Sequence, residues 1–234
     1  MKIGIIVAMD KEFAQLKTLL DNQTAEQHGG KDFVIGTVGN NDIVAQTCGI
    51  GKVNAAIGTV EMIDHYHPDL VISTGVAGGA DVRMEPLDIV VGTQYAYHDV
   101  YCGDNAEYGQ LIGLPPHFIA PKEYVEKAKA LKTSAHIFDG LIVSGDWFVD
   151  SREKMQLILD KFPKAEAVDM ESCAIAQTCY LYKTAFISFR IISDVPLKDT
   201  KAAQYFDFWD RMAEGSFNET KSFLESLSLN QEES

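Results

Sequence analysis

The stretch TAFISFRIISDVP, from Thr184 to Pro196, decides the fold of this chain. It is almost wholly apolar and rich in β-branched residues and phenylalanine, which predicts a buried strand. Pro196 cannot continue regular hydrogen bonding, so the strand is expected to end there. Because side chains two residues apart share a strand face, Arg190, Ile192 and Asp194 are expected to point the same way.

Arg190 and Asp194 admit two interpretations. A charge inside a buried strand must be paired, because burial of an isolated charge is too costly. The first interpretation is a structural ion pair at the end of a core strand. The second makes Asp194 a catalytic carboxylate at the carboxyl end of a central strand, where open α/β sheets place their ligands.

Short apolar runs alternate with amphipathic segments along the rest of the chain. The runs predict strands at 2–8, 33–38, 43–48, 69–74, 87–94, 140–144 and 165–169. The amphipathic segments predict helices at 9–20, 49–63, 121–131, 150–162, from 170 onward and at 202–229. Glycines at 75–79 predict a loop, and 97–118 predicts a long irregular segment. This mixture indicates one three-layer α/β domain over 1–229, followed by a solvated tail at 230–234.

The composition excludes several classes of protein. The chain has 234 residues, of which 46% are hydrophobic, and this suits one globular domain. Its net charge of −14 argues against nucleic acid or an anionic membrane as a partner. No apolar run reaches the ~18 residues of a membrane span, and the N-terminal run is too short for a signal peptide. Scattered cysteines without a C-x-x-C pair fit reduced thiols, so we expect a cytoplasmic protein.

Two short motifs resemble known sites but lack a required part. Gly49-Ile50-Gly51-Lys52 is similar to the end of a P-loop, yet Gln46 and Val53 replace its glycine and its Ser/Thr. His65-Tyr66-His67-Pro68 contains two histidines, yet the proline marks a helix end and no third ligand is nearby. We therefore expect neither triphosphate binding nor metal binding from these motifs.

Several segments, taken together and in order, resemble one protein family. They are AMDKE at 8–12, GIGKV at 49–53, TGVAGG at 74–79, YHD at 97–99, SGDWF at 144–148, VDME at 168–171 and ISD at 192–194. The set is similar to the purine nucleoside phosphorylase/nucleosidase superfamily, and more closely to the bacterial 5′-methylthioadenosine/S-adenosylhomocysteine nucleosidases. The resemblance extends from Met1 to about Leu229. It implies a central mixed, partly barrel-like β-sheet flanked by helices.

The resemblance also implies an activity and a partner. The family hydrolyses the N-glycosidic bond of methylthioadenosine and S-adenosylhomocysteine and releases adenine, in methionine salvage and nucleoside catabolism. No metal and no organic cofactor are implied. A homodimer is implied, in which the partner's loop at 101–118 completes the site.

The resemblance assigns catalytic roles to five residues. Asp194 matches the acid that protonates or hydrogen-bonds adenine N7, and Ser193 beside it helps to hold the site. Glu12 matches the base that activates water for attack on C1′. Arg190 and Glu171 orient that water, and Glu171 also holds the ribose hydroxyls. Two acids with opposite tasks need environments that separate their pKa values.

Further residues match the family's substrate contacts. Phe148 stacks on adenine, backbone groups at Val149 bind its edge, and Met170 lies along the ribose. The apolar residues at the 5′-alkylthio group are Met9, Ile50 and Phe206. The remaining residues expected at the substrate are Ala8, Val76, Gly78 and Asp169.

Three features depart from the family's pattern. Asp169 stands where the family usually has glutamate, which is one methylene longer. Val76 replaces a small polar residue that is usual in the glycine segment. The segment 196–204 is longer than is typical and includes Lys198 and Lys201. It leads into the 5′ pocket, so the preferred 5′ substituent is left open.

The nucleophile separates a hydrolase from a phosphorylase. A phosphorylase needs cations, normally arginine, to hold phosphate. The segments 8–13 and 72–80 contain no arginine, and Glu12 would repel phosphate, so water is favoured. Two alternatives stay open. One is a related hydrolase or phosphorylase acting on another purine nucleoside, such as futalosine or inosine, and the other is a non-enzymatic nucleoside sensor on the same fold.

Overall fold

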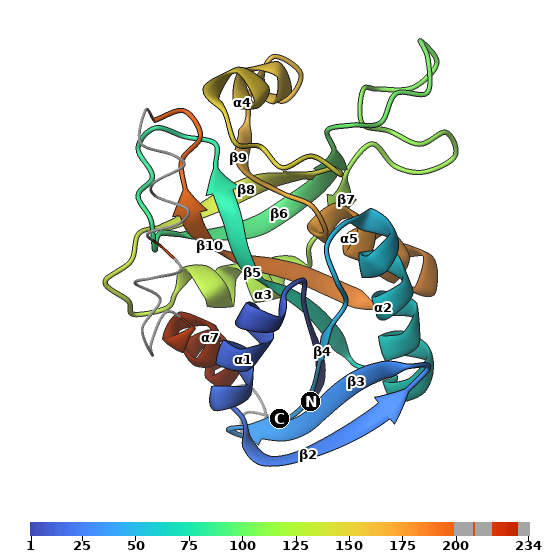
Figure 1. The fold of residues 1–234 in the computed structure, drawn as a ribbon, viewed down its shortest axis with the longest axis vertical. Coiled ribbons are helices and arrows are strands. Elements are labelled where there is room, and N and C mark those ends of the chain that lie inside the picture. The colour runs from blue at the N-terminus through green and yellow to red at the C-terminus, as the bar shows by residue number, and fades with distance from the viewer. Residues whose placement is uncertain (199–207, 209–216, 229–234) are drawn as a thin grey trace.

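A computed structural model describes residues 1–198, 208 and 217–228. Its strands are Lys2–Val7 (β1), Asp21–His28 (β2), Lys31–Val38 (β3), Asn41–Thr47 (β4), Leu70–Gly79 (β5), Ile89–Tyr97 (β6), Phe118–Ile119 (β7), Ile137–Ser144 (β8), Ala165–Asp169 (β9) and Ala185–Asp194 (β10). Its helices are Asp10–Thr18 (α1), Lys52–Tyr66 (α2), Lys122–Lys129 (α3), Arg152–Leu159 (α4), Ser172–Tyr182 (α5) and Asn218–Ser228 (α7). Strands and helices intermix along the chain, as the apolar runs predict (Figure 1).

The strands form one mixed sheet whose central part closes into a barrel. β10 pairs in parallel with β5 and antiparallel with β6. β6 and β9 both pair in parallel with β8, and β9 pairs antiparallel with β5, which closes the ring. The sheet continues outward from β5 through β1, β4, β3 and β2. The predicted α/β class and partly barrel-like sheet are therefore confirmed.

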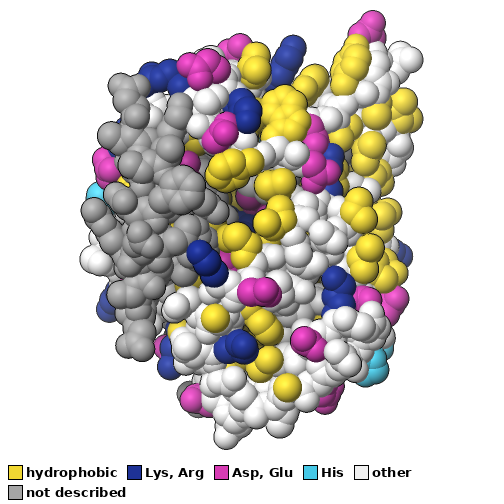
Figure 2. All heavy atoms as spheres, in the orientation of Figure 1, with side chains coloured by type: hydrophobic (Ala, Val, Ile, Leu, Met, Phe, Trp, Pro, Cys, Tyr) yellow, Lys and Arg dark blue, Asp and Glu magenta, His cyan; other side chains and the backbone are white. Residues whose placement is uncertain are grey.

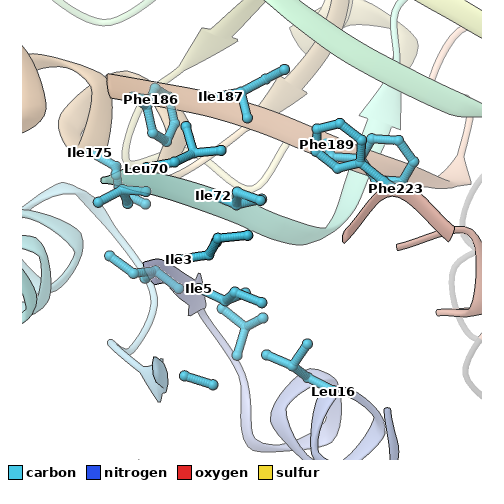
Figure 3. Close-up of a cluster of buried hydrophobic side chains, with 14 of the residues drawn as sticks. Ile3, Ile5, Leu16, Leu70, Ile72, Ile175, Phe186, Ile187, Phe189 and Phe223 are labelled. Atoms are coloured by element: carbon cyan, nitrogen blue, oxygen red, sulfur yellow. The ribbon is translucent and has the colours of Figure 1, made fainter. Parts of the chain in front are cut away.

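The organising strand lies at the centre of the core. β10 is buried over almost its whole length, in agreement with the strand predicted at 184–196. Phe189 stacks on Phe223 of α7, with ring centroids 5.1 Å apart. Ile5 of β1 and Ile72 of β5 belong to the same apolar cluster, which Figure 3 shows between the strands. Helices α2 and α5 pack side by side on one flank, and α3 packs against α7 on another (Figure 1).

Two local expectations are wrong. The glycine segment 75–79 is not a loop but the second half of β5, where Gly75 pairs with Arg190 and Gly78 with Asp194. Pairing with strands on both sides overrides the weak strand preference of glycine. The apolar-run criterion also misses β2, because its sequence DNQTAEQH is polar and exposed along its whole length. β2 is an edge strand that pairs only with β3.

Part of the C-terminal region lies outside the described residues. The helix predicted at 202–229 is described as α7 from Asn218 to Ser228. Phe206, Lys201, the segment 199–204 and the tail 230–234 are not among the described residues. Of the helices that are described, none is long and apolar enough to cross a membrane. The four cysteines are free thiols.

Candidate active site

A cleft opens where several strands reach their carboxyl ends on the same side of the sheet. Its empty space, including the part that is open to solvent, is about 650 Å³. It is lined by the segments that follow β1, β8 and β9, by the carboxyl halves of β5 and β10, and by the turn before α2.

Backbone amides of three residues hold the carboxylate of Glu12, in the first turn of α1. Its Oε2 accepts hydrogen bonds from Ala8 and Met9, each at 3.0 Å, and its Oε1 accepts one from Val76 at 2.9 Å. Burial raises the pKa of Glu12, while these hydrogen bonds and the charge of Arg190 lower it. A carboxylate has about four acceptor positions, so one is left for a group in the cleft.

Gly75 makes room for Glu12. Its φ is 120°, and a Cβ at this position would overlap the Glu12 carboxylate. Only glycine combines this backbone conformation with so close an approach. The glycine in the middle of β5 is therefore required by the site rather than by the strand.

Asp194 lies in a different environment. Its Oδ1 accepts a hydrogen bond of 2.6 Å from Ser193 Oγ. Burial raises the pKa of Asp194 to about 6, and the Ser193 hydrogen bond lowers it in part. Among the described residues, Asp194 thus receives one hydroxyl where Glu12 receives three amides, so fewer hydrogen bonds stabilise the charged form of Asp194.

A register shift in β10 separates Arg190 from Asp194. The pairing of β10 with β5 changes register between Ile192 and Asp194. The alternation that predicts a common face for Arg190 and Asp194 is interrupted there. As a result, the adjacent residues Ser193 and Asp194 both line the cleft, whereas Arg190 does not.

Arg190 is paired behind the cleft. Its Nη2 lies 2.8 Å from Asp169 Oδ2 and 3.9 Å from Glu171 Oε2. Its guanidinium also donates to Thr74 O at 3.0 Å and to Ser73 Oγ at 2.8 Å. The residue is only 1% exposed. This arrangement fits the structural ion-pair interpretation and places Arg190 one layer behind Glu171.

Groups of the protein itself occupy the carboxylate of Asp169. Its Oδ1 accepts from Ser144 Oγ at 2.5 Å and from the amide of Ser172 at 3.2 Å. Its Oδ2 accepts from Ser172 Oγ and faces Arg190. Asp169 borders the cleft, but its hydrogen bonds and its ion pair connect the end of β9 to β8, β10 and the start of α5.

Glu171 joins the cleft to the start of α2. Its Oε1 accepts a hydrogen bond of 2.9 Å from the amide of Gly51. Burial and the neighbouring Asp169 raise the pKa of Glu171 to about 7, and Arg190 lowers it. The next amide, that of Lys52, donates to Asp146 Oδ1 at 2.9 Å. Two carboxylates of the protein therefore accept the hydrogen bonds that the amides at the start of α2 could donate to an anionic ligand.

Two aromatic side chains form an exposed rim of the cleft. Trp147 is 41% exposed and Phe148 is 55% exposed. The Trp147 ring packs edge-on against the buried ring of His98, with centroids 5.3 Å apart. Exposed aromatic faces beside a cleft suit the stacking of a planar ligand.

The structure brings together most of the residues that the resemblance predicts. Those that line the cleft are Ala8, Met9, Glu12, Ile50, Val76, Gly78, Phe148, Val149, Asp169, Met170, Glu171, Ser193 and Asp194. Arg190 lies behind the cleft, and Phe206 lies outside the described residues. The lining also includes Ala77, Trp147 and Val168, which the sequence analysis does not name as site residues. Each of them adjoins a predicted residue in the chain, and this adjacency is the signal that could have identified them.

Comparison with known proteins gives matches along almost the whole chain. The profile of the phosphorylase superfamily matches residues 2–227. A 5′-methylthioadenosine/S-adenosylhomocysteine nucleosidase from Desulfotalea psychrophila is 39% identical over 231 residues, which cover 97% of this chain and 98% of the relative.

Solved structures agree with the sequence matches. The nucleosidase of the same name from Neisseria meningitidis, in complex with methylthio-immucillin-A, has a TM-score of 0.88 at 33% identity and covers 97% of this chain and 98% of its own. A futalosine hydrolase from Helicobacter pylori has a TM-score of 0.86 at 28% identity, covering 96% and 97% of the two chains. The adenine-nucleoside enzyme is the more similar of the two in sequence.

Proposed function

The chain belongs to the phosphorylase superfamily and, within it, to the 5′-methylthioadenosine/S-adenosylhomocysteine nucleosidases, and on this premise we propose that Glu12, Glu171 and Asp194 carry out its reaction. The protein is an N-glycosidic hydrolase of methylthioadenosine and S-adenosylhomocysteine. It releases adenine and the corresponding 5-thioribose product.

Asp194 assists the departure of adenine. Adenine is a poor leaving group as an anion, so N7 must gain a proton or a hydrogen bond as the bond from C1′ to N9 breaks. A pKa of about 6 leaves part of the Asp194 population protonated near neutral pH, and Ser193 holds the carboxyl group in place. The proton passes to N7, and the electrons of the broken bond leave with adenine.

Glu12 prepares the water that captures the sugar. Loss of adenine leaves an oxocarbenium-like ribose, and water must attack its C1′. Three amides fix the Glu12 carboxylate, and its remaining acceptor position takes the proton of that water. Glu171 binds the ribose hydroxyls and orients the water, while Arg190 positions Glu171 from behind.

One observation favours water over phosphate as the nucleophile. Within the described part of the chain, the lining of the cleft contains four carboxylates, of Glu12, Asp169, Glu171 and Asp194, and neither lysine nor arginine. A phosphate dianion would meet repulsion there and would find no guanidinium partner. Neutral water meets no such penalty.

Apolar residues supply the remaining contacts to the substrate. Phe148 stacks on the adenine ring beside Trp147, and the backbone of Val149 binds the edge of the base. Met170 lies along the ribose. Met9 and Ile50 form an apolar surface for the 5′-alkylthio group.

An exposed apolar stripe supports a homodimer. Val53 and Ile57 of α2 are 70% and 48% exposed, and Ile50 precedes them on the same stripe. α5, which packs beside α2, ends with the exposed residues 180–182, Tyr-Leu-Tyr. Figure 2 shows hydrophobic side chains gathered over this region of the surface. A second copy would cover the stripe. Ile50 belongs to the stripe and also lines the cleft, so the interface would reach the cleft, and the loop at 101–118 of the second copy would complete the site.

The cellular role follows from the reaction. The protein acts in the cytoplasm, in methionine salvage and nucleoside catabolism, and four free thiols suit a reducing compartment. Residues 1–229 act as one nucleosidase domain. Nucleic acids and membranes are not partners.

Adenine release from methylthioadenosine, with and without added phosphate, tests the reaction. We expect equal rates in phosphate-free and phosphate-containing buffer. A rate that depends strictly on phosphate would show a phosphorylase and would contradict the argument from the cleft charges. Replacement of methylthioadenosine by futalosine in the same assay distinguishes the alternative substrate, for which we expect a much lower kcat/KM.

A further inference from the structure

Three potential metal ligands meet between the end of β2 and the end of α2. Glu26 and His28 come from β2, and His65 comes from the last turn of α2 (Figure 1). One ligand atom from each residue lies within 4.8 Å of the other two. Only the tertiary fold produces this cluster, because β3, β4 and most of α2 separate His28 from His65 in the chain.

The two imidazole rings are in direct contact. Their centroids are 3.3 Å apart, with the planes tilted by 41°. Two imidazole rings so close together can each offer a nitrogen lone pair to the same cation. All three side chains are exposed, so rotations about their side-chain bonds can move the two rings apart and bring the ligand atoms to the roughly 3.4 Å spacing of a zinc tetrahedron.

Tyr66 orients Glu26. The hydroxyl of this largely buried residue donates to Glu26 Oε2 at 3.0 Å, which leaves the other carboxylate oxygen for a further contact. Outer hydrogen bonds of this kind position metal ligands in proteins.

Glu61 places a further negative charge beside the cluster. It precedes His65 by one helical turn, and its carboxylate lies against the Cα of Gly29, the residue after His28. Its Oε2 is buried and, within the described ranges, has no hydrogen-bond partner. A cation held by the neighbouring histidines would give this oxygen a partner.

We propose that Glu26, His28 and His65 bind a divalent first-row transition-metal ion, with zinc as the reference ion. Two imidazole nitrogens and one carboxylate oxygen are ordinary zinc ligands, and a water completes the tetrahedron. The sequence offers His67 as the partner of His65, but the fold supplies His28 and Glu26 instead. The bound ion ties the edge strand β2 to α2.

The cluster is separate from the cleft. Gly51, which binds Glu171, precedes the first residue of α2, and His65 lies in the last turn of that helix. At a rise of 1.5 Å per residue, the two ends are about 20 Å apart. The ion therefore takes no part in the hydrolysis.

Cobalt(II) is the probe for this site, because a tetrahedral site of two histidines and a carboxylate gives visible d–d absorption. The chelator-treated protein is titrated with cobalt and then with zinc. We expect one cobalt per chain, displaced by zinc, and a rise in Tm of about 5 °C when zinc exceeds its Kd 100-fold. His28→Gln and His65→Gln are each expected to abolish the bands. Glu26→Gln keeps an acceptor for Tyr66 and is expected to weaken zinc binding 10- to 100-fold.

His67→Asn is the matched control. His67 is exposed and adjoins Tyr66, and its φ of 49° suits asparagine. We expect this variant to bind cobalt and zinc as the unchanged protein does. Bands that persist in both His28→Gln and His65→Gln, or an unchanged protein with neither bands nor a Tm rise at millimolar zinc, would overturn the proposal. None of these readouts uses catalysis, so they stand or fall independently of the hydrolase mechanism.

Discussion

Glu12 and Asp194 are two buried carboxyl groups of the cleft with different hydrogen-bond donors. Both side chains are buried, and burial raises the pKa of each. Three amide donors and the charge of Arg190 oppose the rise for Glu12, whereas Ser193 alone opposes it for Asp194. The pKa of both groups is raised on balance, and the two differ in the number of hydrogen bonds that oppose the rise.

Replacement of Asp194 tests its role as the acid. Asp194→Asn keeps the size of the side chain but cannot transfer a proton, so kcat for adenine release is expected to fall about 10²- to 10⁴-fold. The measurement is steady-state turnover of methylthioadenosine, with circular dichroism to establish folding. Asp10→Asn, at an exposed position of α1, is the control and should retain full activity. Activity of Asp194→Asn within tenfold of the unchanged protein would remove Asp194 as the acid.

Stability as a function of pH tests the pKa of Asp194. The folded-state value of about 6 lies above the unfolded value of 3.8, so the folded state binds the proton more tightly. This contribution to the free energy of unfolding is fully present below pH 4 and is lost as the pH rises through 6. It amounts to about 3 kcal/mol.

Urea unfolding at pH 4 and at pH 7 measures this effect. Asp194→Asn cannot ionise, so its free energy of unfolding, relative to that of the unchanged protein, should rise by about 2 kcal/mol between the two pH values, which span most of the full effect. A relative stability that does not change with pH would mean that Asp194 titrates normally in the folded protein.

Gly75 provides a test of how tightly Glu12 is held. Gly75→Ala introduces a Cβ that displaces the Glu12 carboxylate, so we expect kcat to fall at least tenfold, together with a loss of stability. Gly30→Ala is the matched control, because Gly30 also has a positive φ, of 78°, but has no atom within 4 Å of the added Cβ. It should lose about 1 kcal/mol of stability and no activity. Equal activity in the two variants would contradict the proposed fixation of Glu12.

At the scale of elements, α2 performs a different task at each part of its length. The amides at its start bind the carboxylates of Glu171 and Asp146. Its outer face carries the exposed residues Val53 and Ile57. Its last turn supplies His65 to the cluster with β2. A single helix therefore connects the cleft, the expected dimer surface and the proposed metal-binding cluster of Glu26, His28 and His65.

Charged substitutions in the apolar stripe on α2 test whether the stripe forms a dimer interface. Val53→Asp and Ile57→Asp together should shift the protein to a monomer, because a dimer would have to bury two carboxylates in each copy. KM for methylthioadenosine should rise, since the partner's loop at 101–118 no longer completes the site. Sedimentation equilibrium and steady-state kinetics measure the two effects.

Leu157→Asp is the control for the stripe. Leu157 is 60% exposed on α4, at a distance from α2 (Figure 1). It should leave both the oligomeric state and KM unchanged. A double variant of α2 that remains dimeric would place the interface elsewhere.

At the scale of the whole molecule, closure of the barrel assembles the cleft. β9 pairs with the glycine half of β5, and β5 pairs with the end of β10. The closed ring therefore brings the segments 75–78, 168–171 and 193–194 together, and β1 adds the segment 8–12 from the other side of β5. These four short pieces of sequence meet because their strands end at the same edge, and the turn at Ile50 and the segment 147–149 complete the lining.

Some of this assembly could be predicted, and some could not. Apolar runs predict most strands, since burial of β-branched residues is a local property of the sequence. They miss β2, a polar edge strand held by its partner, and they misassign 75–79, where pairing outweighs glycine's preference. Thirteen of the predicted site residues line the cleft. They could be predicted because the motifs that carry the family resemblance occur in the family's order along the chain. The separation of Asp194 from the face of Arg190 coincides with a register shift after Ile192 that no local pattern signals.

The sequence by itself determined most of the strands and helices, the residues expected to carry chemistry and the family that the chain resembles. Those properties depend on neighbours in the chain and on residue identity. Only the tertiary structure decided that Arg190 pairs with Asp169, that Glu12 receives three amides where Asp194 receives one hydroxyl, and that His28 meets His65. The physical reason is that pKa values, ion pairs and ligand clusters depend on distances in space, and long-range strand pairing sets those distances.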